Sequence, residues 1–339
     1  MAGYIDMHCD TLTSLMGKAQ SGDLMENNLS VDLQRLQNNG NAIEFFACFI
    51  YLDRFKSEAG ETLDNADRKD RWNLDRAWAY TMDVLDFYEE NRKKYSQSLY
   101  TVKSARDARF VLSREKPGLC GGLLTVEEGG ILDGSMERLN TLFDRGVRLM
   151  TLTWNFDNCL GHPNSRDASK NALGLTPFGF SVIEAMEKMG MMVDVSHLSD
   201  GGFYDVAQHM KKPFVASHSN ARALCPHPRN LTDHMIRTLA DHGGVAGLNF
   251  CPAFLDEKNG STVEAMTAHV HHMIRVGGED VVALGTDFDG ISGPLEIPHT
   301  GKMELLYHAL KTSGLTQRVL DKLWYGNVLR VMEDVMGDL

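Results

Sequence analysis

Residues 4–10 read Tyr-Ile-Asp-Met-His-Cys-Asp, and residues 4–8 of this stretch are the first of eight apolar segments with the composition of buried β-strands. A short apolar run that ends in polar residues is typical of a strand running out into a loop. Successive side chains of a strand point to opposite faces, so we expect Asp6, His8 and Asp10 to share one face. The other seven segments are residues 42–51, 121–126, 147–153, 191–195, 213–217, 244–249 and 281–286.

Segments with helical spacing separate most of these strands. They span residues 72–91, 136–145, 177–189, 202–210, 232–242, 263–276 and 303–311. Strand–helix alternation repeated eight times predicts an α/β fold of the (β/α)8 TIM-barrel type, and we expect residues 1–339 to form one such domain. An open doubly wound sheet is the alternative, but it would usually carry a glycine-rich phosphate loop after its first strand, and the sequence has none there.

The composition of the chain indicates which binding partners and which cellular compartment to expect. The formal net charge of −12 argues against nucleic acid and anionic membranes as partners. The longest apolar stretch, residues 42–52, contains Glu44 and is too short to span a bilayer. Six scattered cysteines without a CxxC pair indicate reduced thiols. We therefore expect a cytoplasmic protein.

Two long polar loops follow strands. They span residues 53–71 and 158–176, after the second and fourth segments. Loops that follow the strands of a barrel lie at the face where active sites form. Each is interpreted as a lid or binding loop, with a solvated surface excursion as the alternative.

The ends of five strands carry imidazoles and carboxylates at the same relative position. These residues are His8, Asp10, Glu127, Glu128, His197, His218, Asp287 and Asp289. One histidine at a strand end is more often a hydrogen-bonded core residue, but coincidence on five strands favours a metal site. Imidazole and carboxylate ligands suit Zn²⁺, or Mn²⁺, Co²⁺ and Fe²⁺ in its place. Cys9 should point to the opposite face and is not expected to bind the metal.

The number of ligands predicts two ions. Three histidines and two or three carboxylates exceed the needs of one four-coordinate ion but suit two ions roughly 3.5 Å apart, bridged by a carboxylate and a hydroxide. A further carboxylate must then move the proton, and Asp287 is the candidate. Asp289 precedes a glycine, which favours a turn or capping role. Asp6 lies deeper in its strand, so we expect it to support the ligands without touching the metal.

Over its whole length the sequence resembles the membrane (renal) dipeptidase family of zinc metallopeptidases, within the amidohydrolase-like barrels. The resemblance is carried by Asp6-x-His8-x-Asp10-Thr11, Val126–Gly130, Asp194–His197, Ser217–Ser219, Pro228–Asn230, Gly285–Gly290 and Gly326–Val331.

The resemblance implies a role for each site residue. His8 and Asp10 would bind one zinc ion, His197 and His218 the other, and Glu127 both. Asp287 would carry the proton, and Arg229 would bind the carboxylate of the substrate. The implied reaction is attack of a bridging hydroxide on the peptide bond of a dipeptide. The resemblance also implies that the C-terminal residue can be a D-residue. Members of the family often form homodimers.

The sequence departs from the family pattern at two places. The family has one glutamate before the glycines, whereas this chain has two. Counting along the strand favours Glu127 as the bridging ligand, and counting back from Gly129 favours Glu128.

The second departure concerns substrate binding. The best-known family members carry a substrate-binding histidine after the fourth strand. Here Trp154 and Asn155 stand there; Asn155 is the candidate to contact the substrate, and His162 could also approach. An amidohydrolase acting on N-acyl amino acids, lactams or lactones therefore remains an alternative. A non-catalytic barrel with a structural metal is a second, against which the presence of Asp287 argues.

Overall fold

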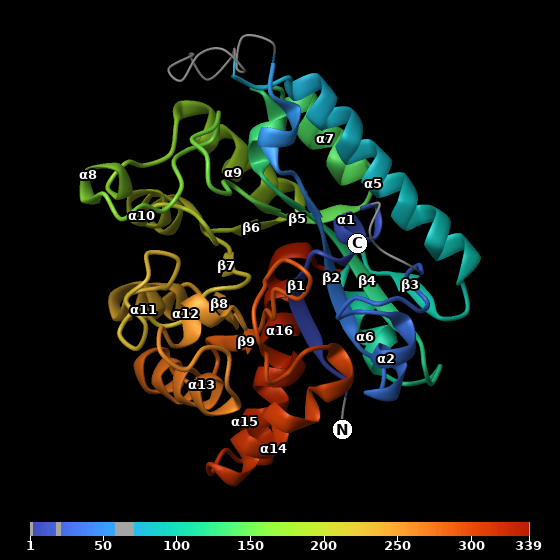
Figure 1. Ribbon diagram of the computed structural model, residues 1–339. Helices are drawn as coiled ribbons and strands as arrows, with labels where there is room; N and C mark the ends of the chain where they lie inside the picture. Colours follow the sequence, from blue (N-terminus) through green and yellow to red (C-terminus); the bar gives the residue numbers. More distant parts are fainter. Residues whose placement is uncertain (1–2, 18–21, 58–70, 339) are drawn as a thin grey trace.

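The computed structural model describes residues 3–17, 22–57 and 71–338, and within them eight parallel strands close into a barrel surrounded by helices (Figure 1). The predicted (β/α)8 fold is confirmed. Most of the predicted loop 53–71 lies outside the described residues. The barrel strands are β1 (Ile5–Cys9), β2 (Ile43–Phe49), β4 (Cys120–Glu127), β5 (Val147–Thr151), β6 (Met192–Asp194), β7 (Val215–Ala216), β8 (Val245–Leu248) and β9 (Val282–Leu284).

Pairing of the first and last strands closes the barrel. Each strand pairs with its neighbour in the order β1, β2, β4, β5, β6, β7, β8, β9, and β9 returns to β1. A further short strand, β3 (Leu99–Thr101), pairs with the start of β4 outside this ring. Each of the eight predicted strand segments overlaps a barrel strand, and β3 was not predicted.

Helices follow the strands at most positions and cover the outside of the barrel (Figure 1). Thr176 caps the first turn of the predicted helix 177–189, and Gly190 ends it in a left-handed conformation. The α-helices are α1 (Thr11–Leu15), α2 (Leu33–Asn38), α5 (Leu74–Lys94), α6 (Ala105–Leu112), α7 (Met136–Asp144), α8 (Ala168–Asn171), α9 (Pro177–Met189), α10 (Asp200–His209), α11 (Asp233–Asp241), α12 (Pro252–Leu255), α13 (Val263–Gly277), α14 (Glu304–Thr312), α15 (Gln317–Asp321) and α16 (Asn327–Met336).

The amino ends of the strands form an apolar floor. The first residues of β1, β2, β6, β7 and β8 join one buried cluster, and Val328, Val331 and Val335 of α16 pack into it. Because these three side chains lie on one stripe of the helix, α16 closes this end of the barrel. Polar residues are thereby left to the opposite, carboxyl end of the strands.

Strand β1 contains a bulge just before the site. Asp6 pairs with Glu44 and Cys9 pairs with Phe46, so three residue steps in β1 match two in β2. A bulge interrupts strict alternation and redirects the side chains that follow it. His8 thereby reaches the barrel mouth, while the Asp6 carboxylate accepts hydrogen bonds from the backbone N–H and hydroxyl of Thr286 at 2.8 and 2.6 Å.

Candidate metal centre

Six of the predicted side chains meet, buried, inside the mouth of the barrel. They come from the ends of five strands: His8 and Asp10 from β1, Glu127 from β4, His197 and His218 from the residues after β6 and β7, and Asp287 from the residues after β9. Their donor atoms form three overlapping groups in which all atoms lie within 4.8 Å of one another: His8–Asp10–Glu127, Glu127–His197–His218 and His8–His218–Asp287.

Glu127 lies between two of these groups and presents one oxygen to each. Its Oε2 is 3.5 Å from Nε2 of His8. Its Oε1 is 3.0 Å from Nε2 of His197 and 3.5 Å from Nε2 of His218. A carboxylate in this position has the geometry to bind a cation on each side.

A hydrogen-bonded chain fixes the tautomer of His218. The Ser217 hydroxyl donates to Asp194 Oδ2 at 2.6 Å and therefore accepts from Nδ1–H of His218, 2.7 Å away. The lone pair of His218 then lies on Nε2, which faces Glu127. Asp194 is itself held by the hydroxyl of Thr151 and by two backbone N–H groups. Such support is typical of metal-binding histidines.

His197 is oriented in the same way by Asn155. Its Nδ1 lies 3.3 Å from Oδ1 of Asn155, so Nδ1–H can donate to that oxygen. Its Nε2 then points into the centre, 3.0 Å from Nε2 of His218. Asn155, predicted to contact the substrate, lines the same cavity and also holds a candidate ligand.

The buried surroundings of the centre shift the pKa values of its three histidines. Burial lowers the pKa of His197 to about 4, and burial lowers the pKa of His218 well below its ordinary value. Both rings are therefore neutral at pH 7, the form that binds a metal ion. Burial also opposes charge on His8, but Glu127 and Asp10 outweigh it and raise the His8 pKa well above its usual range.

Unsatisfied buried atoms provide a test of whether a metal ion fits. Both ring nitrogens of His8, Oδ1 of Asp10 and Oε1 of Glu127 are buried and make no hydrogen bond to any described residue. Buried polar atoms normally have partners. At Gly290 a Cβ atom would lie 2.0 Å from Oδ2 of Asp10 and 2.6 Å from Oδ1 of Asp287, so a side chain there would crowd these oxygens. The donor set therefore fits bound divalent ions.

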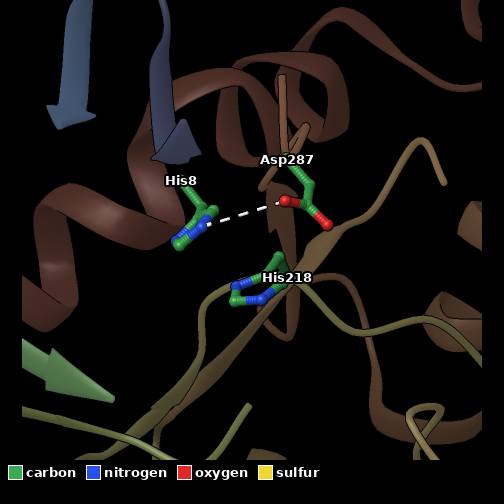
Figure 2. Close-up of side chains that lie close together, drawn as sticks. All are labelled: His8, His218 and Asp287. Atoms are coloured by element: carbon green, nitrogen blue, oxygen red, sulfur yellow. Dashed lines mark ion pairs between the residues drawn. The ribbon is translucent and has the colours of Figure 1, made fainter. Parts of the chain in front are cut away.

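Asp287 lies at the edge of this centre (Figure 2). Its Oδ1 is 3.8 Å from Nε2 of His8, and its Oδ2 accepts a hydrogen bond from Nδ2 of Asn249 at 2.9 Å. Burial, reinforced by the Asp10 carboxylate, raises the pKa of Asp287 to about 7. Asp289 points elsewhere and accepts from Thr11 and Ser30, which agrees with a capping role.

Arg229 is buried and lines the same cavity. Among the described residues its guanidinium donates long hydrogen bonds to the Ser219 hydroxyl at 3.4 Å and the His218 carbonyl at 3.2 Å. Its Nε has no hydrogen-bond partner among the described residues, and the group lies over the ring of Phe254. It therefore keeps donors for an anionic ligand.

Glu128 lies outside the metal groups, although it is fully buried. Its carboxylate accepts from the backbone N–H of Gly130 at 2.7 Å, the side chain of Asn158 at 2.6 Å and the backbone N–H of Trp154 at 3.2 Å. It has a φ of 100°, a conformation that glycine adopts more readily. Glu128 thus ties the end of β4 to the loop that follows β5.

Four of the six side chains, Asp10, Glu127, His197 and Asp287, line a cavity of about 660 Å³. Arg229, Trp154 and Asn155 line it, whereas His162 pairs with Asp157 at 2.8 Å and is not among its lining residues. This volume suits a small organic ligand.

Sequence reasoning missed the roles of Ser217, Asp194 and Asn249. Asp194 and Ser217 belong to the quoted motifs beside His197 and His218, and Asn249 is the last residue of the seventh predicted strand segment. The same position at the strand ends that singled out the histidines could have identified them.

Comparison with known proteins adds independent findings. The sequence model of "Membrane dipeptidase (Peptidase family M19)" matches residues 2–337. An uncharacterized dipeptidase of Schizosaccharomyces pombe is 31% identical over 346 residues, which cover 97% of this chain and 80% of that protein. An uncharacterized Klebsiella pneumoniae protein of the pqqA 5′ region is 41% identical over 220 residues, covering 62% of this chain and 80% of its own.

Solved structures agree with this likeness. The crystal structure of dipeptidase AC, a family M19 metallopeptidase, has a TM-score of 0.85 at 25% identity and covers 99% of both chains. A metallopeptidase of Rhodobacter sphaeroides, solved with a phosphinate mimic of L-Ala-D-Ala, shares the fold with a TM-score of 0.82 at 23% identity over 98% of this chain and 99% of its own.

None of the described helices combines the length and the apolar composition that crossing a membrane requires. The family model, the fold and the buried donor set agree. The chain belongs to the membrane dipeptidase family, peptidase family M19, and is a peptide-bond hydrolase of the metallo-dipeptidase class.

Proposed function

We propose that this protein hydrolyses free dipeptides with two divalent metal ions and that these ions are zinc. The observation that supports this best is Glu127, whose two oxygens face two separate groups of imidazole and carboxylate donors. His8 and Asp10 would hold one ion, His197 and His218 the other, and Glu127 both. When bound, such a pair supplies Lewis-acid activation of water and of the scissile carbonyl.

Asp287 is the proton carrier in this proposal. Its pKa of about 7 allows the carboxylate to take up and release a proton near neutral pH, which general acid–base catalysis requires. Asn249 donates to Oδ2 and so leaves Oδ1, the atom that faces His8, to exchange the proton. The proton would pass from the attacking water to the leaving amine.

Arg229 would bind the carboxylate of the C-terminal residue. Its buried guanidinium lines the cavity with donors that are weakly used, and a planar guanidinium matches a carboxylate with two parallel hydrogen bonds. Asn155 would donate its amide N–H to the substrate while its oxygen holds His197. A cavity of about 660 Å³ with a carboxylate site at one wall suits a dipeptide.

The residues that line the cavity after β5 support a second candidate. Trp154 and Asn155 line the cavity there, so a neutral acyl group could replace the amino end of a dipeptide. The alternative is therefore an amidohydrolase of N-acyl amino acids, lactams or lactones. A D-residue at the C-terminal position of a dipeptide substrate is proposed from the family resemblance.

A matched substrate panel tests the proposal. The zinc- or cobalt-loaded protein is assayed with L,L-dipeptides, L,D-dipeptides and the N-acetyl amino acids of the same residues. We expect hydrolysis of dipeptides and a large rise in KM when their carboxylate is amidated, because Arg229 would lose its partner. Hydrolysis confined to the N-acyl compounds would establish the alternative.

We also propose a cellular compartment and an oligomeric state for the enzyme. All six cysteines are free, which agrees with the reducing cytoplasm. We further propose that the whole chain acts as one unit and that it forms homodimers, as members of the family often do.

A further inference from the structure

Three aromatic side chains line one side of the cavity. Phe49 ends β2, Tyr51 follows it, and Trp154 follows β5. The ring centroids of Phe49 and Trp154 are 5.0 Å apart, and those of Tyr51 and Trp154 are 5.5 Å apart, both with edge-to-face geometry. We call these three residues the aromatic wall.

The aromatic wall touches the candidate metal centre. The Trp154 ring lies 6.1 Å from the ring of His197, one of the candidate ligands. A substrate whose scissile bond lies over the centre would therefore bring a neighbouring side chain against this surface. Tyr51 is 36% exposed, so the wall presents open apolar area to the cavity.

The outer side of the wall is closed. Phe156 packs on Trp154 with a centroid distance of 5.7 Å, and Trp72 packs on Phe156 at 4.9 Å. The guanidinium of Arg71 covers both Trp72 and Phe156 at 4.9 and 5.6 Å. Among the described residues, these contacts cover the wall on the side of Phe156, while Phe49, Tyr51 and Trp154 line the cavity on the other.

Glu128 holds the wall in place. Its buried carboxylate accepts from the backbone N–H of Trp154 and from Asn158, four residues further along the same loop. Buried carboxylates bonded to backbone N–H groups fix a loop more firmly than surface contacts do. The wall is thus pre-organised, which lowers the entropic cost of binding against it.

The order of strands sets which residue of the substrate meets the wall. In the ring β1, β2, β4, β5, β6, β7, β8, β9, strand β2 lies four places from β7 in either direction. Phe49 and Tyr51 extend from β2, and Arg229 lies on the loop after β7. A dipeptide with its carboxylate on Arg229 would cross the centre and point its first residue toward the wall.

We propose that the aromatic wall is the subsite for the side chain of the first, amino-terminal residue and selects a large apolar or aromatic side chain there. This inference rests on the proposed dipeptidase function and on the proposed role of Arg229. Aromatic side chains bind one another through buried area and edge-to-face contacts. The protein should therefore prefer Phe-Ala to both Ala-Ala and Ala-Phe.

The test compares these three dipeptides and non-hydrolysable phosphinate mimics of the same sequences. We expect kcat/KM for Phe-Ala to exceed that for Ala-Ala by roughly tenfold or more. The inhibition constants of the mimics should follow the same order. Tyr51→Ala and Trp154→Ala should each lower the preference several-fold, with the larger change at Trp154.

Tyr100→Ala is the matched control. Tyr100 is 37% exposed and also packs edge-to-face on a phenylalanine, but it lies on β3, outside the barrel ring. This variant should keep the full preference. Because Tyr51 is exposed, Tyr51→Ala should fold even where Trp154→Ala does not.

The inference would be overturned by equal kcat/KM values for Phe-Ala and Ala-Ala or by a higher kcat/KM for Ala-Phe. It would also be overturned if Tyr51→Ala left the preference for Phe-Ala unchanged. Failure to hydrolyse any dipeptide would instead overturn the proposed function. Binding of the phosphinate mimics keeps the two failures apart, because it tests the wall without turnover.

Discussion

The two ends of the barrel are built from the same strands but from opposite chemistry. At the amino ends, residues such as Ile5 and Leu149 form a fully buried apolar floor sealed by α16. At the carboxyl ends, buried carboxylates and imidazoles face one another, several without hydrogen-bond partners among the described residues.

Backbone strain is concentrated at the second end. Of the six described non-glycine residues with positive φ, four belong to the barrel mouth: Glu128, His197, Asp287 and Asp289. Such conformations cost about 1–3 kcal/mol each and persist where the surrounding structure holds them. The floor therefore stabilises the fold, whereas the mouth holds strained residues and buried polar groups that can bind ligands. Substitutions at the two ends should therefore have separable effects.

The largest effect is expected at the mouth, from Asp287→Asn. The amide cannot carry the proton, so kcat of the metal-loaded protein should fall by about 10²–10⁴-fold. The melting temperature should stay equal or rise, because Asn removes a buried charge but retains an oxygen that can accept from Asn249. Metal content, kcat and thermal unfolding measure the three quantities. Loss of bound metal would show that Asp287 is a ligand.

The floor should respond in the opposite way, as Leu149→Ala would show. Leu149 is fully buried in the floor cluster, and the truncation should lower the free energy of unfolding by about 2–5 kcal/mol. The kcat of the protein that remains folded should be unchanged. Urea unfolding and assays at low temperature separate the two readouts. Leu149→Met is the volume-matched control and should cost less than about 1.5 kcal/mol; a large fall in its kcat would contradict the separation.

Metal removal tests whether the mouth gains stability from its ligand. A chelator-treated sample should melt at a lower temperature than one with added zinc, and free zinc at a hundred times its Kd should add about 2.7 kcal/mol. Glu127→Gln should greatly reduce this zinc-dependent shift, because Glu127 faces both donor groups.

Glu128→Gln is the matched control for metal binding. It changes a neighbouring buried carboxylate that accepts hydrogen bonds from backbone N–H groups and Asn158 and belongs to none of the three metal groups. Its zinc-dependent shift should match that of the unaltered protein even if the variant is less stable overall. An equal loss of the shift in both variants would mean that Glu128 takes part in metal binding.

The sequence predicted the barrel because eight apolar runs alternate with helical segments, and five of the runs end in imidazoles or carboxylates at one position. It predicted the convergence of His8, Glu127 and His218 for the same reason. The bulge in β1 was not predicted, since it depends on the register with β2 and not on residue type. Strand β3 was missed because only Leu99 of its three residues is buried, so it has no apolar run.

The support around the ligands was harder to predict. Glu128 could have been a ligand by spacing, and only the backbone turn at φ 100° directs it to the Trp154 loop. The side chains of Asn249 and Ser217 act through hydrogen bonds between neighbouring strands, which one strand's sequence does not show. Helix α16 did carry a readable signal: Val328, Val331 and Val335 repeat at helical spacing.

The smallest effect is expected at an exposed cluster beside the start of β9. The Glu279 carboxylate pairs with Arg318 and with Lys322, the latter at 2.7 Å, and the Arg318 and Lys322 hydrogen bonds lower its pKa to about 2. A carboxyl whose pKa is lower in the folded state stabilises the fold above its unfolded pKa of about 4.5. That stabilisation is lost as the pH falls from there through about 2.

Glu279→Gln should therefore reduce the drop in melting temperature between pH 5 and pH 2, and only slightly, because water and salt screen exposed ion pairs. Added salt should shrink the difference between the variant and the unaltered protein at pH 7. We expect the apolar floor to contribute far more stability than the exposed ion pairs of Glu279. A fall in stability as large as that of Leu149→Ala would contradict this. It would mean that the ion pairs around β9, and not the packing beneath them, hold this end of the barrel closed.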